Sequence, residues 1–190
     1  YVTGLGVVSG IGLGVAENIA SLRKHQHGMG KVTLFPTELD VPVSEVKYSN
    51  EELKRLLSLD IQKTFSRTAL LGMLAAREAV DDARLDLNTL RVGLISSTSV
   101  GGMDLSEHFY NTFKKDNRKG RLREVISHDC GASTEMIADY LKVNDFVTTI
   151  STACSSAANA IMLGARMIRN GQLDAAIVGG TDALCKFTLN

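Results

Sequence analysis

Short apolar runs alternate with longer amphipathic stretches along most of the chain. The runs are rich in Val, Ile, Thr and Ala and occupy residues 1–8, 91–97, 145–152 and 174–180. Runs of this length and composition are typical of strands that are covered on both faces. We therefore predict a strand at each of these positions.

Helical periodicity fills the segments between these runs. It is clearest in residues 65–83 and 155–170, where apolar side chains recur on one stripe, and Gly171 provides a helix stop. Two further helices are expected near residues 104–113 and 133–141. Strands that alternate with helices predict a layered α/β sandwich with a mostly parallel sheet.

Charge and hydropathy exclude several kinds of partner. The 190 residues include 21 basic and 21 acidic side chains, so no overall field favours nucleic acid or an anionic surface. The apolar stretches are much shorter than the roughly 18 residues of a membrane span, and the first residues do not resemble a secretory signal. We expect no nucleic-acid partner, no membrane partner and a cytoplasmic location.

The cysteines and the first glycines give no sign of a metal ion or a cofactor. Cys130, Cys154 and Cys185 lack the paired spacings of a metal site or a disulfide framework. Gly4-Leu-Gly6 resembles the start of a dinucleotide-binding fingerprint, but Ser9 replaces its third glycine. We expect neither a metal nor a cofactor.

Cys154 has the most suggestive position of the three thiols. It lies where the strand at 145–152 gives way to a helix that begins near Ser155. Unpaired N–H groups at a helix amino terminus favour the nucleophilic thiolate form of a cysteine. Position alone leaves a nucleophile and a buried packing residue equally open. For Cys130 and Cys185 the packing role is favoured.

Several motifs, in order, resemble one enzyme family. Thr152-Ala-Cys-Ser-Ser, the small-residue helix that follows it, and Val178-Gly-Gly are similar to the active-site region of the β-ketoacyl-(acyl-carrier-protein) synthases. The likeness extends to the opening Val2-Thr-Gly-Leu-Gly, to Ser97-Thr-Ser-Val-Gly-Gly and to Gly179-Gly-Thr-Asp-Ala-Leu. It is closest to the type II elongating condensing enzymes of the thiolase superfamily. The resemblance implies a thiolase-like amino-terminal domain over residues 1–190, with the carboxy-terminal half absent.

The resemblance also implies a mechanism. Cys154 would take an acyl group from a carrier-protein thioester, and decarboxylation of malonyl-carrier protein would supply the carbanion for a Claisen condensation. The Cys154 N–H would be one oxyanion-hole donor, with two histidines and a lysine supplied by a later part of the chain. The residues expected to line the substrate site are Val100, Gly101, Gly102 and Ala153.

Partners follow from the same resemblance. Condensing enzymes of this family meet acidic acyl carrier proteins with basic patches and form two-fold homodimers through the strand that precedes the active cysteine, here residues 145–152. We expect a homodimer with acyl and malonyl thioesters as substrates. The residues expected to contact carrier protein are Lys63, Arg67, Arg118 and Lys119.

Two other functions remain open. One is a coenzyme A-dependent acyltransferase of the thiolase type, and the doubled serine after Cys154 favours the carrier-protein enzyme over it. The other is a non-catalytic partner subunit similar to a chain-length factor. Retention of Cys154 argues against the second, because such partners commonly replace that residue.

Overall fold

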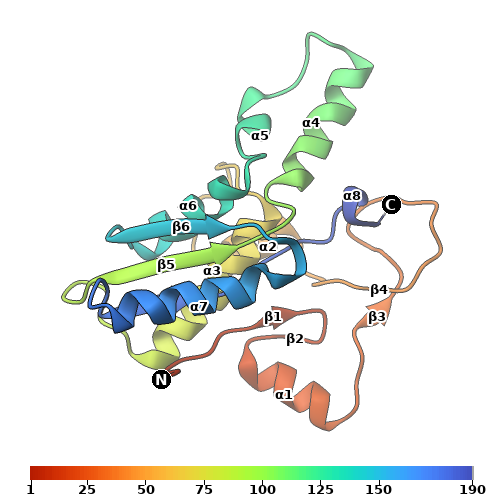
Figure 1. The fold of residues 1–190 in the computed structure, drawn as a ribbon. Coiled ribbons are helices and arrows are strands. Elements are labelled where there is room, and N and C mark those ends of the chain that lie inside the picture. Colours follow the sequence, from red (N-terminus) through yellow and green to blue (C-terminus); the bar gives the residue numbers. More distant parts are fainter. Residues whose placement is uncertain (190) are drawn as a thin grey trace.

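A three-stranded parallel sheet forms the centre of the computed structural model, which describes residues 1–189 (Figure 1). Its strands are β5 (Val92–Ser97), β6 (Phe146–Ile150) and β7 (Ala175–Val178), arranged in the order β6-β5-β7. Gly93 pairs with Phe146 on one side and with Ala176 on the other. The predicted strands at 91–97, 145–152 and 174–180 are thereby confirmed.

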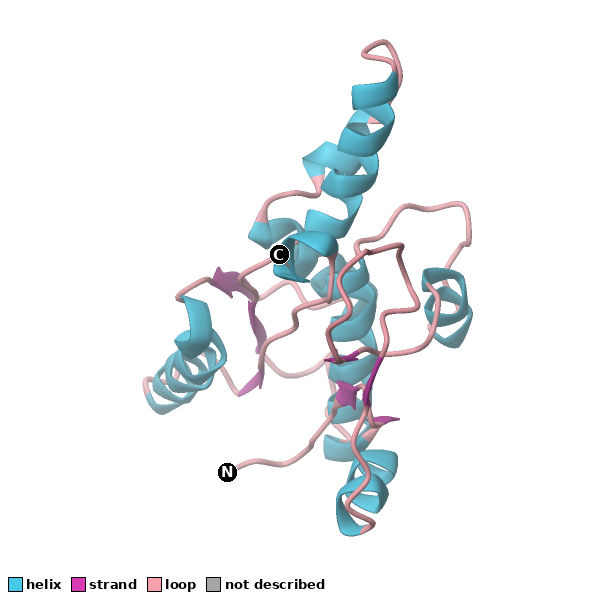
Figure 2. Cartoon of the chain, turned by 90° about the vertical axis from the view of Figure 1, so that its right-hand side faces the viewer, coloured by secondary structure: helices cyan, strands magenta, loops and turns pink. Residues whose placement is uncertain are grey.

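Helices cover both faces of this sheet (Figures 1 and 2). Helices α3 (Arg67–Ala83) and α6 (Cys130–Leu141) pack on one face, and α7 (Ser156–Arg169) packs on the other. The predicted helices at 65–83, 133–141 and 155–170 are therefore confirmed, as is the predicted α/β sandwich with a parallel sheet.

The apolar core divides into two clusters, one on each face of the sheet. The larger cluster joins α3 and α6 to β5 and includes Leu70, Met73 and Ile137, each no more than 2% exposed. The smaller cluster packs Ala160 of α7 against Ile95. The outward face of α7 also carries apolar side chains, among them Ile161 and Ile168, and these are exposed to solvent.

Strand β6 lies at an edge of the sheet. Within the described residues it pairs with β5 alone, and its Val147 is 36% exposed. A free edge of this kind is what pairing with a second copy of the chain requires. The homodimer itself stays a prediction.

The expected strand at residues 1–8 was wrong. Residues 1–7 carry no regular element, and only Val8–Ser9 (β1) forms a short hairpin with Gly12–Leu13 (β2). A Cβ on Gly6 would lie 1.9 Å from the Ala75 carbonyl oxygen of α3, and one on Gly4 would lie 2.2 Å from the Ala79 carbonyl oxygen. The segment packs its glycine backbone directly on the helix in place of joining the sheet.

Shorter elements complete the amino-terminal third of the chain. Helix α1 (Val15–Arg23) follows the first hairpin, and β3 (Met29–Gly30) pairs with β4 (Val43–Ser44). Helix α2 (Asn50–Leu56) begins at a capping box in which the Ser49 side chain accepts from the Glu52 N–H and the Glu52 side chain accepts from the Ser49 N–H. A last helix, α8, spans Lys186–Leu189.

Helix α4 projects beyond the body of the molecule together with the short helix α5 (Figure 2). Their bounds are Met103–Lys115 and Leu122–Ile126, which confirms the helix expected near 104–113. We call residues 103–126 the arm.

Within residues 1–189, every helix is too short or too polar to span a membrane.

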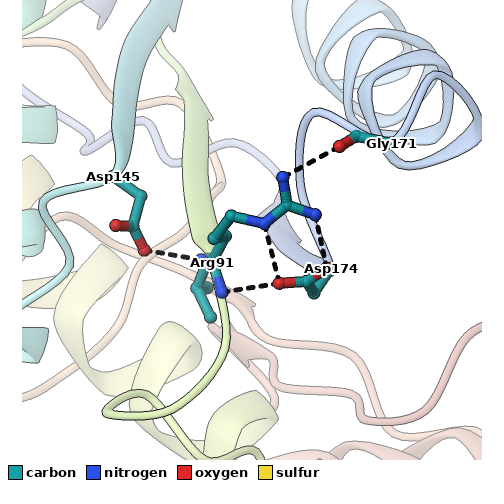
Figure 3. Close-up of polar contacts among 5 residues, drawn as sticks. Arg91, Asp145, Gly171 and Asp174 are labelled. Carbon is teal, nitrogen blue, oxygen red and sulfur yellow. Dashed lines mark hydrogen bonds and ion pairs between the residues drawn. The ribbon is translucent and has the colours of Figure 1, made fainter.

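An arginine clasp joins the amino ends of the strands. The Arg91 guanidinium donates to both carboxylate oxygens of Asp174, at 3.0 and 2.7 Å, and to the Gly171 carbonyl at 2.9 Å (Figure 3). The Asp145 carboxylate accepts from the Val92 N–H at 2.8 Å. These contacts fix the register of the three strands at their amino-terminal ends. That register determines which residues follow the strands at their carboxy-terminal ends.

The clasp makes stability depend on pH in the acid range. Hydrogen bonds from Arg91 lower the pKa of Asp174 from 3.8 to about 2. Because this folded-state pKa lies below the ordinary value, the stabilisation is present above pH 3.8 and is lost as the pH falls toward 2. Asp174→Asn should therefore lower the urea midpoint at pH 7 and make it less sensitive to pH between about 4 and 2. If the urea midpoint of the variant fell equally steeply with acid, the pair of Arg91 and Asp174 would not be the source of the pH dependence.

Candidate active site

Cys154 lies in a tight turn between β6 and α7. The strand ends at Ile150, a 3-10 turn spans Ala153–Ser155, and α7 begins at Ser156. The Cys154 side chain is exposed, whereas Ser156 is buried. The sequence prediction of a cysteine at a strand-to-helix turn is confirmed.

Backbone strain accompanies this turn. Ala153 has a φ of 52°, in the left-handed region that residues with a Cβ rarely adopt. A strained residue directly before Cys154 presents the exposed cysteine side chain at the outside of a sharp corner. Such a conformation persists only where neighbouring contacts hold it.

Side-chain hydrogen bonds supply those contacts. The Ser156 hydroxyl accepts from the Thr152 N–H at 2.8 Å and donates to the Ala153 carbonyl at 2.7 Å, so it bridges the strained peptide. The Asn159 amide donates to the Thr152 hydroxyl at 2.9 Å. The Ser155 hydroxyl donates to the Thr152 carbonyl at 2.9 Å. Polar side chains from both the strand end and the helix thus hold the corner on which Cys154 sits.

These bracing roles were missed by sequence reasoning. Ser156 and Asn159 are three and seven residues from the positions that they contact, Ala153 and Thr152, and the spacing is visible only once the helix start is fixed. Ser and Thr hydroxyls often bond to backbone groups at a helix start, which was the available signal.

The loops that follow the other two strands converge on the same edge of the sheet. The Thr98 N–H donates to the Ile150 carbonyl at 3.4 Å, and the Thr181 N–H donates to the Ser97 carbonyl at 2.9 Å. A Cβ on Gly180 would lie 3.3 Å from the Ala157 Cβ at the start of α7. The turn after β5 and the turn after β7 therefore flank the cysteine corner.

The expected substrate-lining glycines are packed against protein backbone. Gly101 has a φ of 58°, and its Cβ would lie 2.9 Å from the His128 carbonyl oxygen. A Cβ on Gly102 would lie 1.8 Å from the Ser127 carbonyl oxygen. Both glycines are buried, Val100 is half-buried and Ala153 is exposed. The two glycines allow close packing on residues 127–128 at the base of the arm, and contact of these four residues with substrate stays a prediction.

The other two thiols are less exposed than Cys154, and two of the four histidines contact neighbouring side chains. Cys185 is 2% exposed, and burial raises the pKa of its thiol. Cys130 is half-buried at the start of α6. Within the arm, His108 contacts Glu124 at 3.1 Å, and His128, just after the arm, contacts Ser106 of α4 at 2.9 Å. No group of three metal-ligating side chains occurs among the residues that the structure describes.

The expected carrier-protein residues do not share one environment. Lys63 is exposed, and Arg118 and Lys119 are exposed beside Asp116, at 3.4 and 3.6 Å from its carboxylate. Arg67 is buried, at 6% exposure. Its guanidinium donates to the carbonyls of Val46 and Tyr48 and to the Asn50 side chain.

Arg67 therefore lacks the exposure that a docking residue needs, and its inclusion in the docking set was wrong. Its guanidinium binds residues 46–50, the segment that leads into α2. Its backbone N–H donates to the Asp104 carboxylate at 2.8 Å, which ties α3 to the arm. Lys54 is likewise buried, and its ammonium donates to the carbonyls of Ile61 and Lys63.

Known proteins are similar to this chain in fold and in sequence. A solved structure described as the ishigamide ketosynthase/chain length factor superposes with a TM-score of 0.88, at 30% identity, over 98% of this chain and 48% of that one. The ketosynthase ApeO in complex with its chain length factor ApeC, from Xenorhabdus doucetiae, superposes with a TM-score of 0.77 at 24% identity, over 100% of this chain and 48% of that one, and supports the fold alone. The fold is that of the ketosynthases, which is thiolase-like.

The chain belongs to the β-ketoacyl synthase family, whose amino-terminal domain model matches residues 1–188. Nodulation protein E of Rhizobium meliloti (strain 1021) is 29% identical over 96% of this chain and 46% of its own length. The 3-oxoacyl-[acyl-carrier-protein] synthase 2 of Staphylococcus aureus is 28% identical, with the same coverage. The chain spans about half the length of the curated relatives it matches.

Proposed function

We propose that the protein is a condensing enzyme of fatty-acid or polyketide-like synthesis and that Cys154 carries the acyl intermediate. The observation that supports this most directly is the exposed thiol on a strained, braced corner at the start of α7. Exposure lets a thioester approach, and the fixed corner limits the orientations of the sulfur.

The first half-reaction follows from this geometry. The Cys154 thiolate attacks the thioester carbonyl of acyl-carrier protein, a new carbon–sulfur bond forms, and the bond to the carrier sulfur breaks as the carrier leaves as its thiolate. The Cys154 N–H, at the beginning of the helix, is our candidate donor to the oxyanion of that step. Val100 is proposed to form an apolar wall for the acyl chain.

The second half-reaction needs groups that we do not assign within this chain. Cleavage of the malonyl carbon–carbon bond releases carbon dioxide and leaves a carbanion on the carrier-bound acetyl unit. That carbanion attacks the Cys154 thioester, and the sulfur leaves as the 3-oxoacyl product forms. The histidines and the lysine implied by the resemblance would stabilise this step.

Acyl transfer gives the test of the proposed function. The full-length protein that contains these residues is incubated with acyl-carrier protein. The modified peptide is then identified by mass spectrometry. We expect the acyl group on Cys154. An acyl group on Cys130 or Cys185, or no acyl-enzyme at all, would sink the assignment.

The same experiment separates the alternatives. A non-catalytic partner subunit is a second candidate, because one similar structure is described as a ketosynthase/chain length factor. Such a subunit would bind carrier protein without forming an acyl-enzyme. A thiolase-type enzyme would instead load equally well from a coenzyme A thioester.

A hollow beside the arm supports docking of carrier protein. It measures about 640 Å³ and lies between residues 59–65 and helices α5 and α6. Its lining includes the apolar Phe65, Ile126 and Met136 and the basic Lys63 and Arg123. It thus brings together two basic regions that lie far apart in the sequence.

The charge around this hollow is unevenly distributed. Asp60 and Asp139 line it, so its own charge is nearly balanced. The adjoining residues 114–123 carry six basic side chains and one acidic side chain. The positive field therefore comes mainly from the arm, and an acidic carrier protein with an apolar contact face would fit beside it.

Charge reversal tests this docking surface. The triple change Lys63→Glu, Arg118→Glu and Lys119→Glu should slow acyl transfer from carrier protein about tenfold at low salt, because steering by exposed charges acts on the association rate. Transfer from a small soluble thioester should be unchanged. As a matched control, charge reversal at the exposed Lys24 and Arg169, distant in sequence from the hollow, should have little effect. Equal losses with both donors would show that the three residues support the fold.

A further inference from the structure

One carboxylate organises the turn that follows β5. The Asp182 Oδ1 atom accepts from the Thr98 hydroxyl at 2.5 Å, from the Ser99 N–H at 3.0 Å and from the Val100 N–H at 3.2 Å. The Thr98 hydroxyl in turn accepts from the Gly101 N–H at 3.0 Å. We call Asp182, Thr98 and these hydrogen bonds the latch.

The latch joins segments that are 82 to 84 residues apart in sequence. Thr98 is 2% exposed, so its hydroxyl needs a partner inside the protein, and Asp182 provides it. Hydrogen bonds to a charged acceptor are stronger than those between neutral groups. The turn at residues 98–101 is therefore held by the side chain of Asp182, from another part of the chain, and not by its own backbone alone.

Val100 is the side chain whose position depends on this arrangement. It stands between Thr98, which is fixed to the end of β6 through the Ile150 carbonyl, and Gly101, whose φ of 58° begins the entry into the arm. Loss of the latch would free the Val100 N–H from both of its acceptors, Asp182 and the Thr98 hydroxyl. The neighbouring cysteine corner has its own braces and would stay in place.

We propose that Asp182 is a positioning residue that sets the place of Val100 and thereby the acyl chain lengths that Cys154 accepts. The inference rests on the proposed function, because it gives Val100 the role of an apolar wall for the acyl chain. Asp182 acts through the turn and does not touch the reacting atoms.

The alternative is a purely structural role for Asp182. A structural role would lower stability and slow acyl transfer by the same factor for every chain length. A positioning role changes the ratio of the acyl-transfer rate constants for long and short chains, because the wall contacts only acyl groups that reach it. This ratio of rate constants therefore distinguishes the two roles.

The experiment measures the rate constants of acyl-enzyme formation on Cys154 from dodecanoyl- and butyryl-carrier protein. It compares the unmodified protein with Asp182→Asn, Asp182→Ala, Thr98→Val and the double variant Thr98→Val with Asp182→Ala. We expect the ratio of the two rate constants to move toward one by about threefold to tenfold in Asp182→Ala and Thr98→Val, as for loss of one well-placed hydrogen bond. The double variant should be no worse than the worse single variant, because both changes break the same latch.

Ser99→Ala is the matched control. It removes a hydroxyl from the same turn and keeps the N–H that Asp182 accepts, so the ratio should equal that of the unmodified protein. Asp182→Asn keeps the shape and one acceptor oxygen, and it provides a folded variant if Asp182→Ala is unstable. An unmodified protein that loads both chains equally, or variants whose ratios stay within about twofold of it, would overturn the inference. Failure of the unmodified protein to load either chain would refute the proposed function itself.

Discussion

Replacing Cys154 with alanine should abolish the acyl-enzyme and lower formation of 3-oxoacyl product by at least about a thousandfold, as expected for loss of a covalent nucleophile. The fold should be unaffected, because the thiol is exposed. The measurements are intact-protein mass after incubation with acyl-carrier protein, product formation, and the thermal midpoint.

Cys185→Ala gives the opposite pattern and serves as the control. The Cys185 thiol is 2% exposed, and its loss should reduce the free energy of unfolding by about 1 kcal/mol while acylation continues. A Cys154→Ala protein that still forms product at a comparable rate would show that another group carries the acyl chain.

Arg67→Met should be the most destabilising substitution that we consider, at about 3–5 kcal/mol. The change leaves three hydrogen-bond acceptors without their donor, namely the Val46 and Tyr48 carbonyls and the Asn50 side chain. It also removes the cation that opposes the burial of the Asp104 carboxylate, whose Oδ1 atom has no hydrogen-bond partner within residues 1–189. Urea unfolding monitored by circular dichroism measures the loss.

The loss of stability in Arg67→Met should depend on pH. Burial raises the pKa of Asp104, and the charge of Arg67 opposes that rise. Without Arg67 the pKa of Asp104 should rise further, so the folded state binds a proton more tightly than the unfolded chain. Arg67→Met should therefore be more destabilising at about pH 8 than at about pH 5. Arg55→Met, on the exposed face of α2, should change stability by less than about 0.5 kcal/mol. Equal effects of the two substitutions would refute the structural role of Arg67.

The sheet and its helices were predictable because their sequences carry strong local signals. Residues 92–97 form a fully buried run, and α3 and α7 each present one apolar stripe to the sheet. The opening segment is also apolar, but Gly4 and Gly6 place it against the backbone of α3. Apolar content alone does not distinguish a strand from a segment that packs on a helix.

The position of Cys154 was also predictable, because a small-residue motif and a strand-to-helix boundary coincide there. The role of Arg67 was not predictable, since its acceptors lie 17 to 21 residues away, in and just before α2. Asp182 contacts a turn 82 to 84 residues earlier in the chain. Contacts of this range depend on the finished fold, and one sequence carries no local trace of them.

The left-handed conformation of Ala153 restricts how this corner can evolve. Glycine adopts that conformation freely, so selection for stability alone would favour glycine there, by about 1 kcal/mol. Glycine would also let the peptide before Cys154 visit other conformations, and β-branched residues are barred from the position on steric grounds. Alanine is thus the smallest side chain that still limits the backbone. Few substitutions are therefore tolerated at position 153, because glycine loosens the corner and β-branched residues prevent it from forming.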